Sequence, residues 1–471
     1  MAGMPGGRAA GHAVAALSLA ALVAVVGGCA DPGGITGPAR STAGAGSPGG
    51  GDGRTDPGEA GAGSGATSSG HTRSRGEDPS TDQVRRVAAD LLGARSVALA
   101  ERDRGAWVAT VADPASDDGR RQIAAYDALV ALGVRDLQVG SVRDLPGAPS
   151  GGPIGSAGPR ETWTGTVEIA WAIPGYDAGA RTTTRTVTLR STSAGWRVGR
   201  DGGPTDQLQV WDLGAIQVER SPTTLVAGTA DVATLRARLA DAEAAQPRLA
   251  RLFGAPVRAV LVVPADAAAA ARQLGRPDST SLGALAAAAD GPLGPDGRAV
   301  ADRVVVNPEG FAVLTDEGRR VVVAHELTHV AVRATTPGDV PTWLSEGLAE
   351  YVGLHGVSLP DTSVAGQLLQ RVRAEGVPHA LPTTEQFEPT RADAASAYQG
   401  SWLAVRWIAD RFGEATLLAF YRAAAGGSAT GATAGSPPAA RTDAALREIL
   451  GMTPDEFVRA WQSELATLAG P

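Results

Sequence analysis

Residues 325–329 read His-Glu-Leu-Thr-His. They lie in a predicted helix for which Thr315 or Asp316 can serve as the N-cap. His325 and His329 are four residues apart, so their side chains lie on one helix face, about 40° apart around the axis. Two imidazoles in that arrangement can bind one metal ion, and neutral imidazole nitrogens suit Zn²⁺. The stretch therefore predicts a zinc site on a helix.

Glu326, which directly follows the first histidine, points in a different direction from the two histidines. Glu326 lies about 100° further around the helix than His325, so it cannot share the approach of the histidines to the metal. It can reach a water at the open coordination position, which is where a general base is needed. Two histidines are too few for a catalytic zinc site, which usually has three protein ligands. A third His at the spacing of the metzincin peptidases is excluded, because Thr335 stands there.

The gluzincin peptidase pattern instead places the third ligand, a Glu, on a second helix. Residues 343–351 read Trp-Leu-Ser-Glu-Gly-Leu-Ala-Glu-Tyr and fit that pattern. In it, Glu346 would bind the metal. Glu350 lies one turn later on the same helix face, where it could accept the second N–H of a liganding His.

Together, His325-Glu326-x-x-His329 and Trp-Leu-x-Glu-Gly-Leu-Ala-x-Tyr resemble the gluzincin metallopeptidases, the group that contains thermolysin and the membrane alanyl aminopeptidases. The resemblance implies one Zn²⁺ per chain, bound by His325, His329 and Glu346. It also implies that Glu326 is the general base and that Glu350 orients the first His. The implied activity is hydrolysis of peptide bonds in a peptide or protein substrate. Aminopeptidase activity is not implied, because the sequence lacks the Gly-x-Met-Glu-Asn motif.

The same resemblance implies two further features. In the family, a strand before the zinc helix forms the sheet edge along which substrate pairs, and residues 303–307, Arg-Val-Val-Val-Asn, would be that strand. Related peptidases also place a Tyr at a helix start, where its hydroxyl stabilises the oxyanion. Tyr398 is the candidate for this catalytic role, and a tyrosine of the core is the alternative.

A second interpretation of the whole motif is a catalytically inactive protein that keeps the peptidase fold. Such a lipoprotein would bind a peptide or a partner protein of the cell envelope. The presence of Glu326 favours the enzyme, because a binding protein has no need of a general base. Metal content and turnover separate the two interpretations.

The N-terminus has the features of an export signal. Arg8 precedes an apolar run, Ala13–Val26, that is too short to span a bilayer as a helix. The sequence Val26-Gly27-Gly28-Cys29 then resembles the lipobox of bacterial lipoproteins. The resemblance implies that residues 1–29 are a lipoprotein signal peptide and that Cys29 receives a diacylglycerol group. The protein would be lipid-anchored to the cell membrane on its extracytoplasmic face, and plain secretion is the alternative.

Composition limits the partners of the chain. The 471 residues carry a net charge of −8, which argues against a basic nucleic-acid-binding surface, so no nucleic-acid partner is expected. Cys29 is the only cysteine, which excludes an internal disulfide framework and a thiolate metal cluster. Residues 30–80 are dominated by Gly, Ser, Pro, Ala and Thr, a composition typical of a disordered linker.

Two folded regions are expected after the linker. Residues 81–202 predict short helices followed by a curved sheet, an α+β accessory domain whose element order resembles the nuclear-transport-factor-like cone fold. Residues 203–224 are interpreted as a connector. Residues 225–471 predict one mostly helical, gluzincin-like peptidase domain with a small edge sheet. The expected fold class is therefore α+β, with two regions that fold separately.

Overall fold

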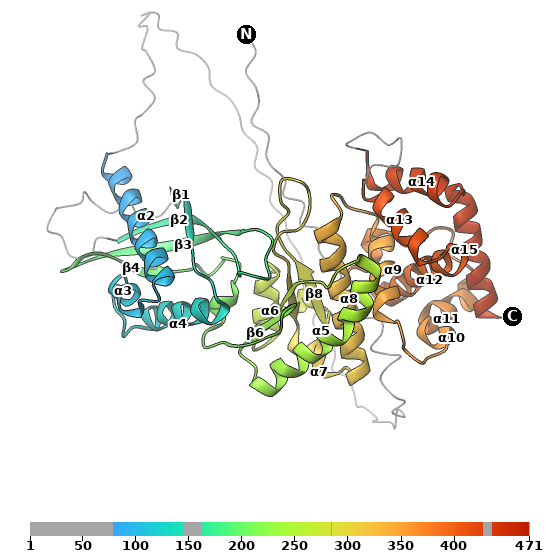
Figure 1. Ribbon diagram of the computed structural model, residues 1–471, viewed down its shortest axis with the longest axis horizontal. Coiled ribbons are helices and arrows are strands. Elements are labelled where there is room, and N and C mark those ends of the chain that lie inside the picture. Colours follow the sequence, from blue (N-terminus) through green and yellow to red (C-terminus); the bar gives the residue numbers. More distant parts are fainter. Residues whose placement is uncertain (1–78, 146–161, 284, 427–435, 471) are drawn as a thin grey trace, which may run out of the picture.

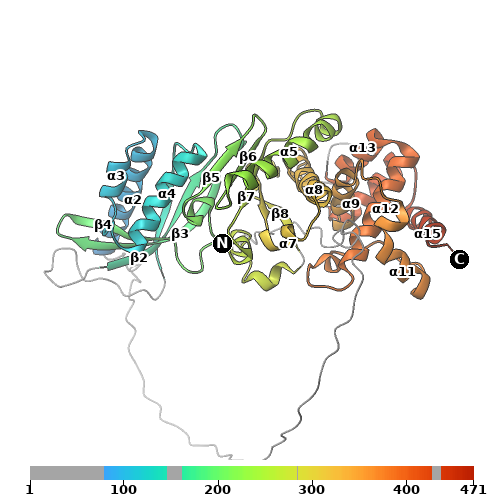
Figure 2. The same ribbon diagram turned by 90° about the horizontal axis from the view of Figure 1, so that it is seen from below.

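The computed structural model describes residues 79–145, 162–283, 285–426 and 436–470. Within them, helices and strands are mixed, as an α+β chain requires, and the strands form two sheets. Figures 1 and 2 show the N-terminal elements, the second sheet and the C-terminal helices in a row along the long axis. None of the described helices has the length and apolar character needed to cross a membrane. The predicted signal peptide, Cys29 and most of the linker lie outside the described residues.

The N-terminal part is an antiparallel sheet packed against three helices (Figure 1). Its elements are α2 (Pro79–Ala100), α3 (Arg104–Ala109), α4 (Asp117–Leu132), β1 (Gln138–Asp144), β2 (Thr162–Trp171), β3 (Arg181–Thr192) and β4 (Gly195–Asp201), with the strands in sequence order across the sheet. Burial alternates along β2, where Trp163, Val167 and Trp171 face the core. Helices therefore precede an antiparallel sheet here, and β1 is a strand that the sequence had not indicated.

The second sheet is mixed and lies in the middle of the molecule (Figure 2). Its strands follow the order β5 (Gln217–Arg220), β6 (Thr224–Gly228), β7 (Ala259–Val263), β9 (Arg303–Val306) and β8 (Ala287–Asp290). β6, β7 and β9 are parallel, while β5 and β8 pair antiparallel at the two edges. The prediction that residues 303–307 form the sheet edge is therefore wrong. β8 covers that side of β9, and its sequence, Ala-Ala-Ala-Asp, has too little strand propensity to be recognised locally.

Helices connect the strands of the second sheet and build the C-terminal part. They are η1 (Val210–Leu213), α5 (Val232–Phe253), α6 (Ala267–Gln273), η2 (Ser279–Leu282), α7 (Pro308–Ala312), α8 (Asp316–Thr335), α9 (Thr342–Gly353), α10 (Asp361–Val364), α11 (Gly366–Glu375), η3 (Thr384–Phe387), α12 (Ala394–Phe412), α13 (Glu414–Ala424), α14 (Pro438–Ile449) and α15 (Pro454–Ala469). Thr315 is the N-cap of α8, since its hydroxyl accepts a hydrogen bond from Gly318 N at 3.1 Å. Tyr398 does not stand at a helix start as predicted, because α12 begins one turn earlier.

Alternate residues of the second sheet face two different hydrophobic cores. Val226 and Leu261 pack on the side of α5 and α8. Leu225 and Val260, one position away in each strand, pack into the core of the N-terminal sheet and helices. The N-terminal part therefore covers one face of the second sheet. The expectation that the two regions fold separately does not account for this shared core.

Buried polar contacts join the same two parts. Arg303 of β9 donates hydrogen bonds to both carboxylate oxygens of Asp177 at 2.6 and 2.7 Å, and both side chains are almost inaccessible. Arg181 of β3 donates to the carbonyl oxygen of Ala301 at 2.8 Å. Separating the parts would leave these charges buried without partners or expose them together with apolar surface.

This packing predicts that a fragment of residues 225–471 is unstable. We expect it to aggregate, or to unfold well below a fragment of residues 79–471, because Leu225 and Val260 would face water. A fragment of residues 215–471 is the matched control, since it restores β5 but still lacks the N-terminal core. Size-exclusion chromatography and thermal unfolding measure the difference. A monomeric 225–471 fragment with an unchanged Tm would show that the shared core contributes little.

Candidate metal centre

Close packing of α9 against its neighbours brings the second motif to the first. A Cβ on Gly347 would lie 2.5 Å from the carbonyl oxygen of Ser401 in α12, and one on Gly353 would lie 2.9 Å from that of Val321 in α8. A glycine inside a helix costs about 1 kcal/mol relative to alanine. Both glycines are explained by the approach of the helix backbones, which positions Glu346 next to the histidines of α8.

Three potential ligand atoms converge between α8 and α9. The Nε2 atoms of His325 and His329 are 3.1 Å apart, and Glu346 Oε2 lies 3.3 Å from the first and 3.4 Å from the second. Three ligand atoms around a tetrahedral ion, at metal–ligand distances of about 2.0–2.1 Å, would be about 3.3–3.4 Å apart. The three predicted ligands are therefore together in space, at a separation at which they could hold one metal ion.

The electrostatics of this cluster favour a cation. His325, His329 and Glu346 are each at most 4% exposed. Burial lowers the pKa of His325, but the carboxylates of Glu346, Glu350 and Glu326 outweigh it and raise this pKa to about 9. Burial raises the pKa of Glu346, but the two imidazoles outweigh it and lower this pKa. Three buried carboxylates around two imidazoles leave an excess of negative charge that a divalent ion would compensate.

Glu350 lies on the Nδ1 side of the first histidine, as predicted. Its Oε1 is 3.8 Å from Nδ1 of His325, a close approach that is longer than a hydrogen bond. Neither oxygen of Glu350 has a hydrogen-bond partner among the described residues. Burial raises the pKa of this carboxyl to about 7, and nearby Glu346 and Glu326 add to the effect while His325 opposes it. Glu350 is therefore positioned to accept a proton or a hydrogen bond from His325.

The two predicted catalytic side chains are both buried at this centre. Glu326 is fully buried, and its charge contributes to the raised pKa values of His325 and Tyr398. The Tyr398 ring lies 6.4 Å from that of His325, and its hydroxyl has no hydrogen-bond partner among the described residues. Burial, followed by the charges of Glu346 and Glu350, raises the pKa of Tyr398 well above its usual value. The phenol therefore stays protonated and can donate a hydrogen bond.

Two further residues near the second histidine were not expected from the sequence. Ser345 Oγ lies 3.4 Å from Nδ1 of His329. Burial raises the pKa of Tyr421 in α13, while its hydrogen bond with Ser345 lowers it in part. Nδ1 of His329 thus faces Ser345, which leaves Nε2 for the metal. Ser345 directly precedes Glu346 in the sequence, and this position could have suggested that it lies near the centre. No local sequence pattern connects Tyr421 with the centre.

A short turn covers the Tyr398 side of the centre. Phe387 of η3 is fully buried and packs edge-on against the Tyr398 ring, with 5.1 Å between the ring centroids. The hydroxyls of Thr384, in the same turn, and Thr342, at the start of α9, are hydrogen-bonded at 2.8 Å. The three ligand residues, together with Glu326, Glu350 and Tyr398, are each at most 4% exposed, whereas Ser345 is partly exposed, so little of the centre is accessible to solvent in this conformation.

No family model matches this chain, and a search of curated proteins finds no match. The functional assignment therefore depends on the geometry of the centre and on the motif.

Proposed function

We propose that this protein is a zinc metallopeptidase of the gluzincin type. The proposal is supported mainly by three ligand atoms that converge in a buried, acidic site: His325 Nε2, His329 Nε2 and Glu346 Oε2. Two imidazoles and one carboxylate are the ligand set of thermolysin-type catalytic zinc. When bound there, Zn²⁺ would polarise the attacking water and the scissile carbonyl group.

In this proposal the chain's own side chains move the proton and orient the ligands. Glu326 accepts a proton from the attacking water and passes it to the leaving amine. Tyr398 donates a hydrogen bond from its protonated hydroxyl to the oxygen that gains negative charge. Glu350, 3.8 Å from Nδ1 of His325, and Ser345, 3.4 Å from Nδ1 of His329, lie on the sides of the imidazoles from which they can orient them. A peptide or protein substrate enters when the turn that carries Phe387 moves away from Tyr398.

A second candidate function is peptide or partner binding without catalysis. The closure of the centre by Phe387 and by the Thr342–Thr384 hydrogen bond is the observation that favours it. Such a protein would still bind zinc, because the three ligands are present. It would differ from the enzyme in turnover and not in metal content.

A peptide-library digest with the purified full chain tests the proposed function. We expect about one zinc per chain by metal analysis, cleavage of library peptides, loss of cleavage after treatment with a zinc chelator, and recovery on adding Zn²⁺. Zinc without cleavage of any peptide would favour the binding protein. A chain that binds no metal would contradict both candidates.

We also propose that Cys29 anchors the protein to the outer face of the cell membrane. Its position directly after Val26-Gly27-Gly28 supports this, together with the absence of any other cysteine. Cys29→Ser should release the protein into the medium or leave it unprocessed, because the thioether cannot form. Membrane fractionation and the mass of the mature chain measure the result. A mature Cys29→Ser protein that stays with the membrane would contradict lipid anchoring.

A further inference from the structure

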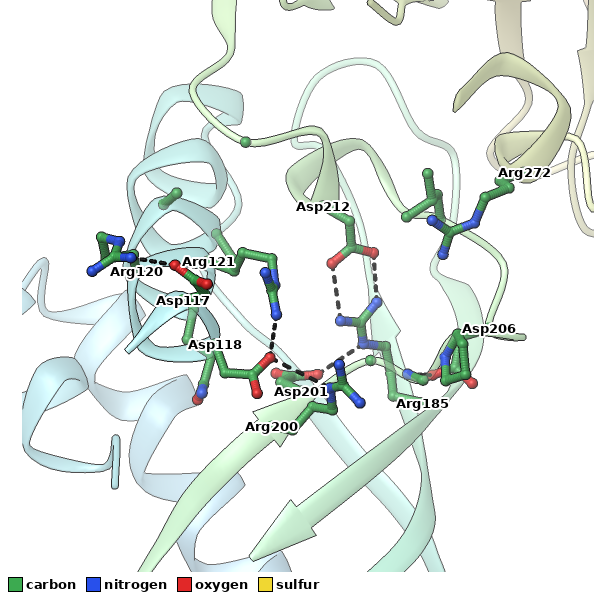
Figure 3. Close-up of a pocket in the computed structure, with 18 of the residues that line it drawn as sticks. Asp117, Asp118, Arg120, Arg121, Arg185, Arg200, Asp201, Asp206, Asp212 and Arg272 are labelled. Carbon is green, nitrogen blue, oxygen red and sulfur yellow. Dashed lines mark hydrogen bonds and ion pairs between the residues drawn. The ribbon is translucent and has the colours of Figure 1, made fainter. Parts of the chain in front are cut away.

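A large polar cleft lies in the part of the molecule that carries none of the metal ligands (Figure 3). Its volume is about 640 Å³, inside the range of roughly 300–1,000 Å³ that is usual for small-molecule sites. Its walls come from the first turns of α4, from β3 and β4, from the loop of residues 202–208, from η1 and from α6. The cleft therefore lies where the N-terminal sheet meets a helix of the second sheet, and such junctions commonly bind ligands.

The floor of the cleft is a charge-neutral network. Arg185, whose side chain is 3% exposed, donates to Asp201 at 2.9 Å and to both oxygens of Asp212 at 2.6 and 2.9 Å (Figure 3). Behind it, buried Arg95 donates to the other oxygen of Asp201 at 3.0 Å. Two guanidinium groups and two carboxylates compensate each other, so this floor is fixed in position and attracts neither sign of charge strongly.

Two other acids of the cleft are also satisfied. Asp206 accepts hydrogen bonds from the backbone N–H and the hydroxyl of Thr186, at 2.7 and 2.8 Å, and from Gly203 N at 2.8 Å. Asp117 pairs with Arg120 at the exposed mouth. Neither carboxylate is left to neutralise the remaining arginines.

Those remaining arginines outnumber the acids around them. Asp118 accepts from both Arg121 and Arg200, the latter at 3.4 Å. Arg272 of α6 has no side-chain partner among the described residues, and Figure 3 shows it across the Arg185–Asp212 pair from Arg121. Three guanidinium groups thus face one carboxylate, a local excess of positive charge in a chain whose net charge is −8.

Backbone contacts hold the two walls together. Leu208 N donates to the carbonyl oxygen of Arg272 at 3.2 Å, and the side-chain amide of Gln207 donates to that of Gln273 at 2.6 Å. These bonds fix the end of α6 to the loop before η1. The backbone of Arg272 is therefore held in position relative to the loop before η1.

We propose that this cleft binds a small molecule with two acidic groups, either carboxylates or phosphates. One acidic group would be bound by Arg272, and the other by Arg121 and Arg200 in place of Asp118. The planar guanidinium groups suit both kinds of group, because each can donate two parallel hydrogen bonds. The site is separate from the proposed peptidase centre and adds a ligand-binding function at the junction of the N-terminal part with α6.

Isothermal titration of the purified full chain with succinate and with pyrophosphate, which each carry two acidic groups, tests the proposal. We expect saturable binding of at least one of the two that weakens with salt, and weaker binding of acetate and of inorganic phosphate, which each carry one acidic group. The tighter-binding of succinate and pyrophosphate identifies the kind of acidic group. Arg272→Ala should reduce the affinity about tenfold or more, since it removes a charge-assisted hydrogen-bond donor. Asp118→Asn should increase the affinity, because it frees Arg121 and Arg200.

Arg422→Ala is the matched control, since Arg422 is exposed on α13 in the C-terminal part and should leave the affinity unchanged. Equal loss in Arg422→Ala and Arg272→Ala would overturn the proposal, because the effect would then come from net charge. Weaker binding in Asp118→Asn would also overturn it. If neither succinate nor pyrophosphate binds but an acidic peptide does, the cleft is a protein-docking surface and the proposal is wrong.

Discussion

Glu326→Gln should leave the metal content near one per chain while peptide hydrolysis falls by at least the ~10²-fold expected for loss of a general base. Gln keeps the shape and the hydrogen-bonding capacity of Glu but cannot accept the proton. The three converging ligand atoms belong to His325, His329 and Glu346, so the metal site itself stays intact. Metal analysis and turnover on one preparation measure both quantities.

Glu317→Gln is the matched control for this change. Glu317 lies in the first turn of the same helix, α8, eight residues before His325 and therefore about 12 Å away along the helix axis. Glu317→Gln removes the same charge as Glu326→Gln. Because Glu317 is not part of the metal centre, we expect turnover close to that of the wild type. Unchanged turnover in Glu326→Gln would contradict the proposed mechanism. Loss of metal in Glu326→Gln would show that Glu326 holds the centre together and is not a dedicated base.

Glu346→Ala should weaken zinc binding far more than Glu350→Ala. Glu346 Oε2 lies within 3.4 Å of both Nε2 atoms, whereas Glu350 approaches only Nδ1 of His325, at 3.8 Å. Without Glu346, two of the three proposed ligands remain. Without Glu350, all three remain, but the imidazole of His325 is less well oriented. A ~10–100-fold loss of affinity is usual for removal of such an outer partner, and the loss in Glu346→Ala should exceed it. Competition with a chromophoric chelator measures both affinities.

Both substitutions remove a buried carboxylate, so the fold of each variant needs a separate measurement. Circular dichroism and thermal unfolding of the metal-free proteins supply it. Glu346→Gln is a second test, since it keeps the side-chain volume but is a weaker ligand. A Glu350→Ala protein that loses more zinc than a folded Glu346→Ala protein would contradict the assignment of the third ligand.

The candidate metal site was largely predictable because the information for it is local. Thr315 caps the helix and is followed by an apolar run. The helical repeat then brings His325 and His329 to one face. The same repeat aligns Glu346 and Glu350 on α9. Only the assembly of the two helices needed tertiary contacts, such as the close approach of the α12 backbone to Gly347 of α9, which the structure shows.

Other features of the molecule were not predictable in this way. Ser345 of α9 contacts Tyr421 of α13 and His329, and Phe387 packs against Tyr398 from a turn that no motif marks. The arginines of the polar cleft come from α4, β4 and α6, and their excess over Asp118 appears only once those elements meet. Each of these features depends on side chains that are far apart in sequence and have no periodic relation to one another.

The sequence by itself determined the helices that carry the candidate metal ligands, because capping and the 3.6-residue repeat act within a few turns of one helix. It also indicated the sheet within residues 81–202, where the β-branched and aromatic side chains of β2 and β3 favour strands. Only the tertiary structure decided that β8 forms the sheet edge and that Leu225 and Val260 belong to the N-terminal core. Strand pairing and shared burial depend on what a segment meets in space, and a run such as Ala-Ala-Ala-Asp becomes a strand because β9 offers it hydrogen-bond partners.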